Sequence, residues 1–479
     1  MIREARFLPI RDQSSVRVAS VRSNIASAWR SNIASTRSNS YTCAVWKMGL
    51  AIAAIALSQV AAAESLSITQ AVDEAFQTSP QIQMADSKSK EAGWRKTGSY
   101  AGILPTLNFG ATHNFEQKFQ TVQISLGGGP PILFPEIGPT TIYSLNANLP
   151  LFDGFANYRR LDASRSFASA AQDDADWSKF QVGRQVMLQF YRALAAKTLQ
   201  EVAENNVKVL EDHQHDVTQF RKAGVSTNYD VLRVEVQVNE ARSELMNSAD
   251  NVELAKTQLT ALMGRDDDSR VLVGELPVLK KEIVNLASLN SLEERKDINS
   301  MQKYSQAMDQ MADASGRYLI PHLDLQGSYQ LYNNTNSNAF DADVTRNAYS
   351  VGVSLTWNIF DGMASISKSR VASEQKYQSE KSLRAANLKA KQDLSVWKRK
   401  YAYFCDFYHA RLSDIEKSKE SVRLAKEGRR AGIRTNTDLL DAEADLYRSQ
   451  AGAVNAQIGA IEALINLELT TGRKLFDFK

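Results

Sequence analysis

Cysteine and histidine are scarce in this sequence, whose 479 residues include two cysteines and five histidines. Cys43 lies in an amino-terminal segment that we expect to be removed, so Cys405 would remain alone and no intrachain disulfide could form. The sequence has no Cys/His cluster, no phosphate-binding loop and no Ser/His/Asp set with a supporting turn motif. His213 and His215 are two apart on a predicted helix and point away from each other. We therefore predict neither an enzyme nor a metal or cofactor site.

Long hydrophobic runs are also missing. The main apolar run, Gly49–Leu57, is nine residues long, whereas a membrane-spanning helix needs ~20. It follows a lysine and precedes Ala61–Ala63, which is typical of an export signal cleaved before Glu64. Two explanations stay open for residues 1–47: a start codon assigned too early, with translation beginning near Met48, or a functional extension.

The excess of positive charge is confined to this leader. The first 63 residues contain eight basic and two acidic residues, whereas the remainder contains 49 basic and 52 acidic residues. The formal charge of +3 for the whole chain therefore becomes −3 for the mature part. The net positive charge is no reason to expect nucleic acid as a partner.

Proline is absent from two long stretches. Residues 162–222 and 369–430 contain no proline and one glycine each. Each stretch predicts one helix of about sixty residues, roughly 90 Å long at ~1.5 Å per residue. Apolar residues at heptad-like spacing indicate coiled-coil packing, although Asn206 and His213 interrupt the first series. A shorter return helix is expected after each long one.

The two long helices end in the same turn. Residues 223–230 (AGVSTNYD) return 208 positions later as residues 431–438 (AGIRTNTD). The glycine can take the left-handed conformation that closes a helix, and Thr-x-x-Asp caps the next helix. Each segment therefore predicts the tip of a helical hairpin. Leu151–Gly154 and Ile359–Gly362 share the offset, which indicates an internal duplication without insertions from this point on.

Alternating apolar and polar residues predict two pairs of strands, at about 106–152 and about 322–360. Each strand is long enough to cross a membrane at ~10 residues per crossing. Four strands cannot close a barrel of useful bore, so several chains must share one barrel if the strands span a membrane. The variable segment between Phe115 and Thr140 predicts a loop. The alternative is a soluble sandwich, whose half-buried strands alternate in the same way.

These patterns together predict two structural repeats after the leader. We expect a leader and signal peptide in residues 1–63, a first repeat in 64–264 with strands at about 106–152 and a helical hairpin at about 153–264, a linker in 265–288, and a second repeat in 289–479 with strands at about 322–360 and a helical hairpin at about 361–472.

The order of these features resembles the outer-membrane efflux protein family, the TolC-like channels. The resemblance covers Ser65–Lys479 and rests on the export signal, the duplicated unit, Pro105 and Pro321 at the first strand of each copy, the Phe-Asp-Gly corner and the tip sequence. It implies an α+β membrane protein, a trimeric twelve-stranded β-barrel with four strands from each chain, continued by a long α-helical coiled-coil tunnel. Residues 265–288 would form an equatorial linker around that tunnel.

The resemblance also implies a function. The chain would be the outer-membrane channel of a tripartite export system, a homotrimer in outer-membrane lipid that extends into the periplasm. It would be a passive conduit for drugs or secreted proteins. A periplasmic adaptor (membrane fusion) protein and an inner-membrane transporter would open its periplasmic tip.

Particular tip residues match the family's functional positions. Asp438 and Asp441 match an acidic ring at the channel entrance, and Arg434 and Asp230 match a donor and an acceptor in the network that keeps the entrance shut. The tip residues expected to contact the adaptor are Gly224, Val225, Ser226, Gly432, Ile433 and Thr435. The family usually has an aromatic residue three positions before the tip glycine, whereas this chain has arginines there, Arg221 and Arg429.

Other interpretations stay open. Asp230 and Asp438 occupy the third position of a helix, where capping alone favours an acid. Asp441 is more informative, because it follows Asp438 by three residues on one helical face, where like charges repel, and the first copy has Arg233 there. The alternative to a channel is a periplasmic adaptor or a coiled-coil structural protein without a pore. Drug efflux and type I protein secretion are both compatible with the sequence, and Gly-x-Arg-Thr at the second tip favours secretion.

Overall fold

The computed structural model describes residues 65–115, 120–124, 127–130, 132–136, 141–266, 270–283, 286, 289, 294–333 and 345–477. The predicted leader and signal peptide lie outside the described residues. Parts of the predicted linker and of the strand-connecting loops also lie outside them. Residues 65–479 form one compact unit.

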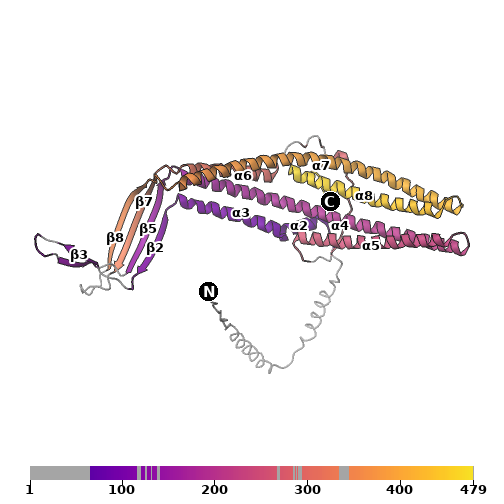
Figure 1. The fold of residues 1–479 in the computed structure, drawn as a ribbon, viewed down its shortest axis with the longest axis horizontal. Helices are drawn as coiled ribbons and strands as arrows, with labels where there is room; N and C mark the ends of the chain where they lie inside the picture. Colours follow the sequence, from indigo (N-terminus) through magenta and orange to yellow (C-terminus); the bar gives the residue numbers. More distant parts are fainter. Residues whose placement is uncertain are drawn as a thin grey trace, which may run out of the picture. The chain divides into compact units, whose positions relative to one another are not determined.

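Two helical hairpins make up most of the described chain. The first consists of α4 (Ala156–Lys222) and α5 (Asn228–Met263), and the second of α7 (Ala364–Arg430) and α8 (Asn436–Thr471). Both long helices have 67 residues, ~100 Å at the usual rise, and both return helices have 36. Each helix of the second hairpin begins 208 residues after its counterpart, so the predicted duplication is confirmed at the level of whole helices. In Figure 1 the partners of each hairpin run side by side to a tight turn.

Shorter helices pack along the long ones. Helix α2 (Ile68–Thr78) contacts α4 and α5, and α3 (Pro80–Ser99) contacts α4. Helix α6 (Lys296–Gly316) lies against both α4 and α7, and so joins the two hairpins. Pro80 begins α3 at a position where its missing N–H costs nothing, which explains the break between α2 and α3. None of the helices in the described ranges contains an apolar stretch long enough to cross a membrane.

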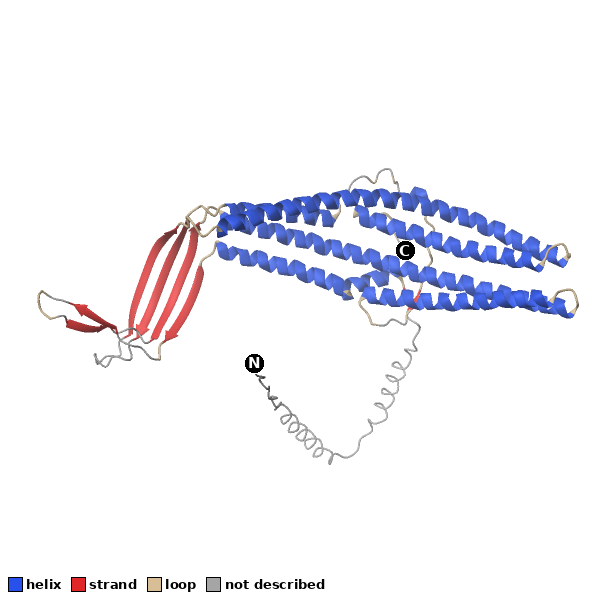
Figure 2. Cartoon of the chain, in the orientation of Figure 1, coloured by secondary structure: helices blue, strands red, loops and turns tan. Residues whose placement is uncertain are grey.

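The predicted strands form one antiparallel sheet. Its strands are β2 (Thr106–His113), β5 (Thr141–Phe152), β7 (His322–Asn333) and β8 (Thr345–Thr356), paired in the order β2-β5-β7-β8. The central β5–β7 pair joins the first repeat to the second, and β2 and β8 are the edge strands. Figure 2 shows these four strands in red, as one sheet at the end of the helices opposite the hairpin tips.

The predicted loop between Phe115 and Thr140 was wrong in part. Strands β3 (Gln120–Ile124) and β4 (Ile132–Glu136) pair there as a separate antiparallel hairpin. The sequence Thr-Val-Gln-Ile and its partner Ile-Leu-Phe are rich in β-formers and flank a glycine- and proline-rich turn, which favours a hairpin. The glycines between the two segments led to the prediction of a loop, whereas the β-forming residues on either side of them form the hairpin.

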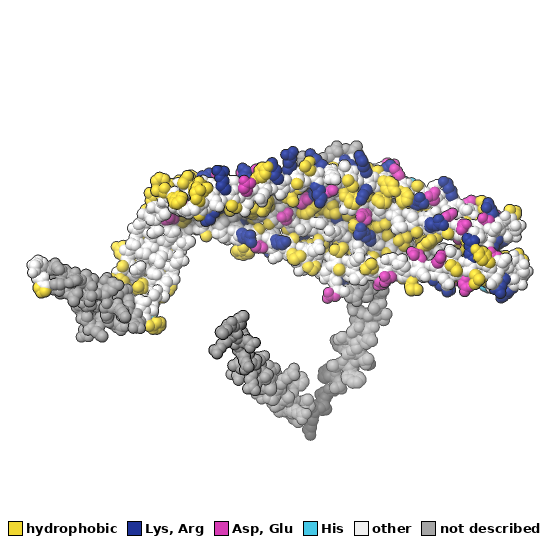
Figure 3. All heavy atoms as spheres, viewed as in Figure 1, with side chains coloured by type: hydrophobic (Ala, Val, Ile, Leu, Met, Phe, Trp, Pro, Cys, Tyr) yellow, Lys and Arg dark blue, Asp and Glu magenta, His cyan; other side chains and the backbone are white. Residues whose placement is uncertain are grey.

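The two faces of the four-stranded sheet differ in polarity. One row across all four strands is apolar, and the next row is polar. The apolar row consists of Phe109, Leu145, Tyr329 and Tyr349, and the polar row of Asn108, Asn146, Ser328 and Ser350. The sheet face visible in Figure 3 is mostly white and carries hardly any charged side chains, whereas blue and magenta side chains gather over the helices.

A sharp corner joins each strand pair to its long helix. At the first corner Gly154 and Phe155 both have positive φ, 67° and 63°, and Gly362 and Met363 repeat this conformation with 68° and 75°. The side chain of Asp153 accepts a hydrogen bond from the backbone N–H of Asn157 at 2.7 Å. The Phe-Asp-Gly motif therefore supplies a flexible corner residue and an acid that satisfies the first turn of the helix.

The main hydrophobic core lies where both hairpins meet the shorter helices. Its helical members come from α2, α3, α4, α5, α7 and α8, and the largest fully buried side chains include Phe190, Tyr191, Tyr401, Ile461 and Leu464. The parallel pair of β1 (Ser65–Leu66) and β6 (Val271–Leu272) contributes Leu66 and Leu272. Each return helix ends here on a left-handed glycine, Gly264 or Gly472, where a Cβ atom would lie 2.6 or 2.8 Å from a backbone oxygen.

Candidate functional site

The hairpin tips are the part of the structure on which the predicted functional residues converge. Gly224 and Gly432 take the left-handed conformation, with φ of 77° and 73°. The backbone N–H of Val225 donates to the Phe220 carbonyl at 2.9 Å, and Ile433 donates to the Gly428 carbonyl at 2.8 Å. These bonds close the long helices by the backbone pattern that a left-handed glycine permits.

Both return helices begin with a capping box, as predicted. In the second tip the backbone N–H of Asp438 donates to Thr435 Oγ1 at 3.2 Å, and Thr435 N–H donates to Asp438 Oδ2 at 2.8 Å. The first tip repeats both bonds between Asp230 and Thr227, at 3.1 and 3.0 Å. Hydrogen bonds from these threonines lower the pKa of both aspartates. The carboxylates therefore support the caps above their ordinary titration range, and this support is lost only as pH falls through the lowered values.

Replacing Thr435 with alanine should loosen the start of α8. The substitution removes one of the two cap bonds, and such a loss corresponds to about fivefold faster local opening. Amide hydrogen exchange of residues 436–440 would measure it. The matched Thr227→Ala variant should produce the same change in α5 only, because the two caps are built alike. Equal exchange in both variants and the wild type would contradict a stabilising role for the boxes.

The remaining predicted residues lie as follows. Asp441 is exposed on α8, three residues after Asp438, and Val225 and Ile433 project from the tips with about three quarters of their surface exposed, 76% and 80%. Arg434 and Asp230 are not brought together: among residues 141–266 and 345–477, no hydrogen bond or ion pair joins them. Arg434 instead lies near enough to Asp438 to help lower the pKa of that carboxyl.

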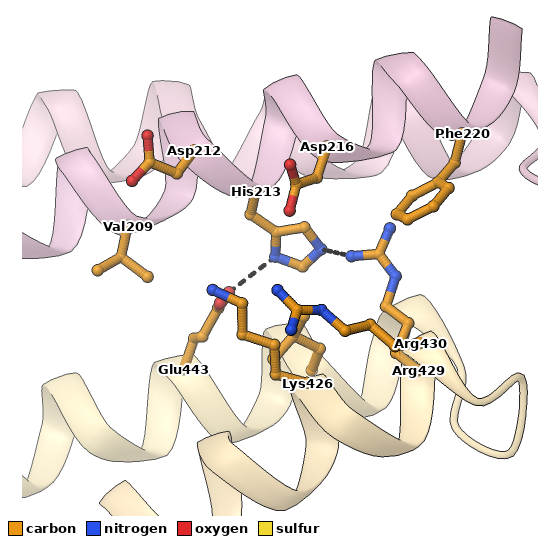
Figure 4. A pocket seen from close by; sticks show the side chains of 10 residues that line it. Val209, Asp212, His213, Asp216, Phe220, Lys426, Arg429, Arg430 and Glu443 are labelled. Atoms are coloured by element: carbon orange, nitrogen blue, oxygen red, sulfur yellow. Dashed lines mark hydrogen bonds and ion pairs between the residues drawn. The ribbon is translucent and has the colours of Figure 1, made fainter.

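The contacts that join the two hairpins near the tips involve other residues. His213 of α4 is 4% exposed. Its Nδ1 lies 2.8 Å from Glu443 Oε2, and its Nε2 lies 2.7 Å from Asn436 Oδ1 and 2.8 Å from Arg429 Nη1. A second link is nearby, since Arg233 of α5 donates to Thr437 Oγ1 at 2.8 Å. Figure 4 shows the His213 ring pointing from α4 toward the second hairpin.

Sequence reasoning did not select His213. It noted this residue as an interruption of the heptad pattern and noted Arg429 as a departure from the family's aromatic. Each of these irregularities was a signal, because a polar residue on a buried helix face needs a partner. The arginine also keeps contact with an aromatic ring, since its guanidinium carbon lies 5.2 Å from the ring centre of Phe220.

Comparison with known proteins now gives the family. The sequence matches the outer membrane efflux protein family over residues 71–265 and 288–473. A search of curated proteins gives no match. The family match includes both repeats, and the predicted resemblance is confirmed.

Solved structures share the fold. VceC from Vibrio cholerae is 17% identical, with a TM-score of 0.71 over 85% of this chain and 96% of that chain. A membrane protein from Pseudomonas aeruginosa is 19% identical, with a TM-score of 0.72 over 85% and 93%. The open state of the Neisseria gonorrhoeae MtrE outer membrane channel is 20% identical, with a TM-score of 0.64 over 85% and 88%. The chain belongs to the outer membrane efflux protein family, whose members are channels of the outer membrane that extend into the periplasm.

Proposed function

We propose that three copies of this chain form a passive export conduit that an adaptor and an inner-membrane transporter open at the hairpin tips. The observation that carries this proposal is the four-stranded sheet, which has one apolar face, one polar face and two unpaired edges.

The edges require more than one copy. Strands β2 and β8 each have a neighbour on one side only, and lipid does not tolerate unpaired backbone groups. Pairing β8 of one copy with β2 of the next satisfies both edges without new elements. Three copies then give twelve strands, the number that the family resemblance implies. Strands β5, β7 and β8 have twelve residues each, enough to cross a bilayer at the usual tilt.

The two faces suit a barrel wall. Large apolar side chains on one face are exposed in the single chain, such as Phe109 at 71% and Tyr349 at 83%. An apolar band of this kind fits lipid, and the polar face, which includes Asn146 and Ser328, fits a water-filled lumen. A soluble rod or adaptor gives no reason for this exposed apolar face, so the conduit is preferred to that alternative.

The hairpin tips would form the periplasmic entrance. Asp438 and Asp441 lie in the first two turns of α8, and three copies would place six carboxylates around one opening. Rings of acidic side chains attract cations in narrow pores. Contacts with the adaptor would use the tip surface around Val225 and Ile433. The cargo class, drugs or secreted proteins, would depend on the transporter rather than on a binding pocket of this chain, and we assign the chain no catalytic step.

Removing the acidic ring should change ion selectivity. In planar bilayers, the double variant Asp438→Ala and Asp441→Ala should lose most of the cation preference of the wild-type channel, because six negative charges leave the constriction. The reversal potential in a salt gradient measures this preference. The double variant Asp250→Ala and Glu253→Ala removes the same charge from the middle of α5 and should leave selectivity close to wild type. Unchanged selectivity in the tip variant would remove the ring from the proposal.

Fractionation tests the conduit as a whole. Recovery of a heat-modifiable trimer from outer membranes supports it, and release of the protein with the soluble periplasm would favour the rod. Purification of the protein together with an inner-membrane transporter would identify the export system and decide between drug efflux and secretion.

A further inference from the structure

The contact between the hairpins at His213 contains two hydrogen bonds that exclude each other. His213 Nδ1 lies 2.8 Å from a carboxylate oxygen of Glu443, so Nδ1 carries the proton and donates. The other ring nitrogen, Nε2, lies 2.8 Å from the donor Arg429 Nη1 and 2.7 Å from the acceptor Asn436 Oδ1. Neutral imidazole has a lone pair at Nε2 and accepts from Arg429. Imidazolium has an N–H there and donates to Asn436 instead.

Each protonation state leaves one neighbour without its bond. In the neutral state the Asn436 oxygen faces a lone pair, and among the described residues its Nδ2 is buried without a hydrogen-bond partner. In the charged state the guanidinium of Arg429 faces a second cation and an N–H group. The proton on Nε2 therefore decides whether His213 holds α7 through Arg429 or holds only α8 through Asn436 and Glu443.

The first tip shows the same residues without a histidine. Arg221 and Asn228 are the counterparts of Arg429 and Asn436, and Arg221 Nη1 donates to Asn228 Oδ1 at 2.9 Å. The counterpart of His213 in the duplication is Ser421. In the second tip, Nε2 of His213 from the other hairpin lies within hydrogen-bond distance of both the arginine and the asparagine. The histidine is thus an asymmetric addition that links one tip to the opposite hairpin.

Charged groups surround the histidine from every neighbouring helix. On α4 itself Asp212 and Asp216 line the adjoining cavity of ≈ 110 Å³, which α7 lines with Lys426, Arg429 and Arg430, and α8 with Glu443. From α5, Arg233 reaches Thr437, and Asp230 acts electrostatically on Arg429. Figure 4 shows Asp216 and Phe220 on the α4 side of the cavity, opposite the basic residues.

The cavity already disfavours a further positive charge near Arg429. Burial lowers the pKa of Arg429, and the charges of Asp216, Glu443 and Asp230 oppose that effect. These three acids act electrostatically on one half-buried guanidinium. A second cation at His213 would compete for the same carboxylates, so proton uptake there would weaken the attachment of Arg429.

We propose that His213 is a proton-sensitive joint that ties the first hairpin to the end of α7 when it is neutral and releases that end when it is protonated. We call His213 with Glu443, Asn436 and Arg429 the His213 joint. Because α7 leads directly into the second tip, release at Arg429 would favour opening of the entrance in mild acid. The inference rests on the proposed conduit only for this last step.

Conductance of the purified full-length channel tests the last step. Lowering the pH on the tip side from about 8 to about 5 spans the range in which imidazoles titrate. The open fraction of the wild-type channel should rise about tenfold, the equivalent of one hydrogen bond to a charged group. His213→Gln should lose this step, because glutamine does not titrate. His215→Gln, which changes an exposed histidine two residues away, should keep it. Asp230 and Asp438, whose pKa values are lowered, remain ionised throughout in every variant.

A distance measurement tests the joint independently of conduction. Spin labels at Gln219 on α4 and Ser421 on α7, both exposed, report the separation of the two hairpins. We expect this distance to lengthen in acid in the wild type and in His215→Gln, and to be independent of pH in His213→Gln. Arg429→Gln removes the partner on α7 and should show the longer distance at every pH. This variant tests the joint even if His213→Gln does not fold.

The outcomes separate the two proposals. A distance that does not change with pH in the wild type, or that changes equally in His213→Gln, would overturn the joint. A pH-dependent distance in a protein that never conducts would leave the joint intact and would instead overturn the conduit. Conduction with the same pH dependence in the wild type and in His213→Gln would overturn the step from release at Arg429 to opening of the entrance.

Discussion

Replacing Val351 with arginine is expected to abolish the heat-modifiable trimer in the outer membrane. Val351 lies in the middle of β8 on the apolar face of the sheet and is 76% exposed in the single chain. An arginine facing lipid at the bilayer midplane costs about 2–4 kcal/mol, and each trimer would carry three. In the proposed barrel the same strand also pairs with the next copy, so this free-energy cost opposes both the folding of each chain and the assembly of the trimer. Semi-native electrophoresis of outer-membrane fractions, heated and unheated, measures the trimer.

Gln330→Arg is the matched control for this substitution. Gln330 is in the neighbouring strand β7, on the polar face, next to Ser144 in the register. An arginine there would face the proposed lumen, and we expect trimers in normal amounts. Equal loss in both variants would indicate a general folding defect. Normal trimers from Val351→Arg would show that this face does not contact lipid, and the barrel would need a different wall.

Replacing Arg184 with methionine is expected to lower the free energy of unfolding by about 3–5 kcal/mol, the cost of leaving one partner of a buried ion pair alone. Arg184 Nε lies 3.0 Å from Glu468 Oε2, and the two side chains are 7% and 0% exposed. Burial lowers the pKa of Arg184 and raises that of Glu468, and each charge opposes the shift of the other. Glu468 also accepts from the backbone N–H groups of Leu475 and Phe476 at 2.6 and 3.0 Å, which holds the carboxyl-terminal segment on the core.

The midpoint of denaturant unfolding of the detergent-solubilised protein measures this loss. Arg192→Met is the control, because Arg192 and Glu462 form an ion pair of the same length, 3.0 Å, between the same two helices. That pair is exposed, at 45% and 37%, so its loss should cost no more than about 1 kcal/mol. Adding Glu468→Gln to Arg184→Met should restore part of the stability, since the unpaired charge disappears. Equal midpoints for Arg184→Met and Arg192→Met would contradict the assignment of the buried pair.

The local features of the tips were predictable because each depends on neighbours in the sequence. Gly224 and Gly432 close helices by their own conformational freedom, and Thr435 meets an acid three residues on. The alternation of apolar and polar residues in the strands is equally local. It predicted one apolar and one polar face for the sheet without any knowledge of which strands pair. The β3–β4 hairpin was missed because its two runs are only five residues long and glycine and proline stand between them.

The tip residues themselves were found, but their partners were not. Asp230 and Arg434 were matched from the resemblance, and within this chain they do not meet. His213 meets Glu443 across 230 positions of sequence, and such a contact leaves no periodic trace in either helix. The two irregularities that pointed to it, a histidine in a heptad series and an arginine in place of an aromatic, become interpretable only when both helices are placed.

By itself the sequence determined the duplication, the long helices, the turns that end them and the family to which the chain belongs. Periodicity and capping depend on residues a few positions apart, and the duplication depends on one constant offset of 208 residues, so none of these features requires knowledge of the tertiary structure. Tertiary structure alone decided how the two copies join: through the β5–β7 pair, through the buried Arg184–Glu468 pair and through the His213 joint. At the equivalent positions of the other copy, Thr260, Gln392 and Ser421 stand for Glu468, Arg184 and His213, whereas Arg221, Asn228 and Glu235 repeat Arg429, Asn436 and Glu443. Two copies of one design therefore differ where they touch, because a polar group that is buried between them needs one specific partner.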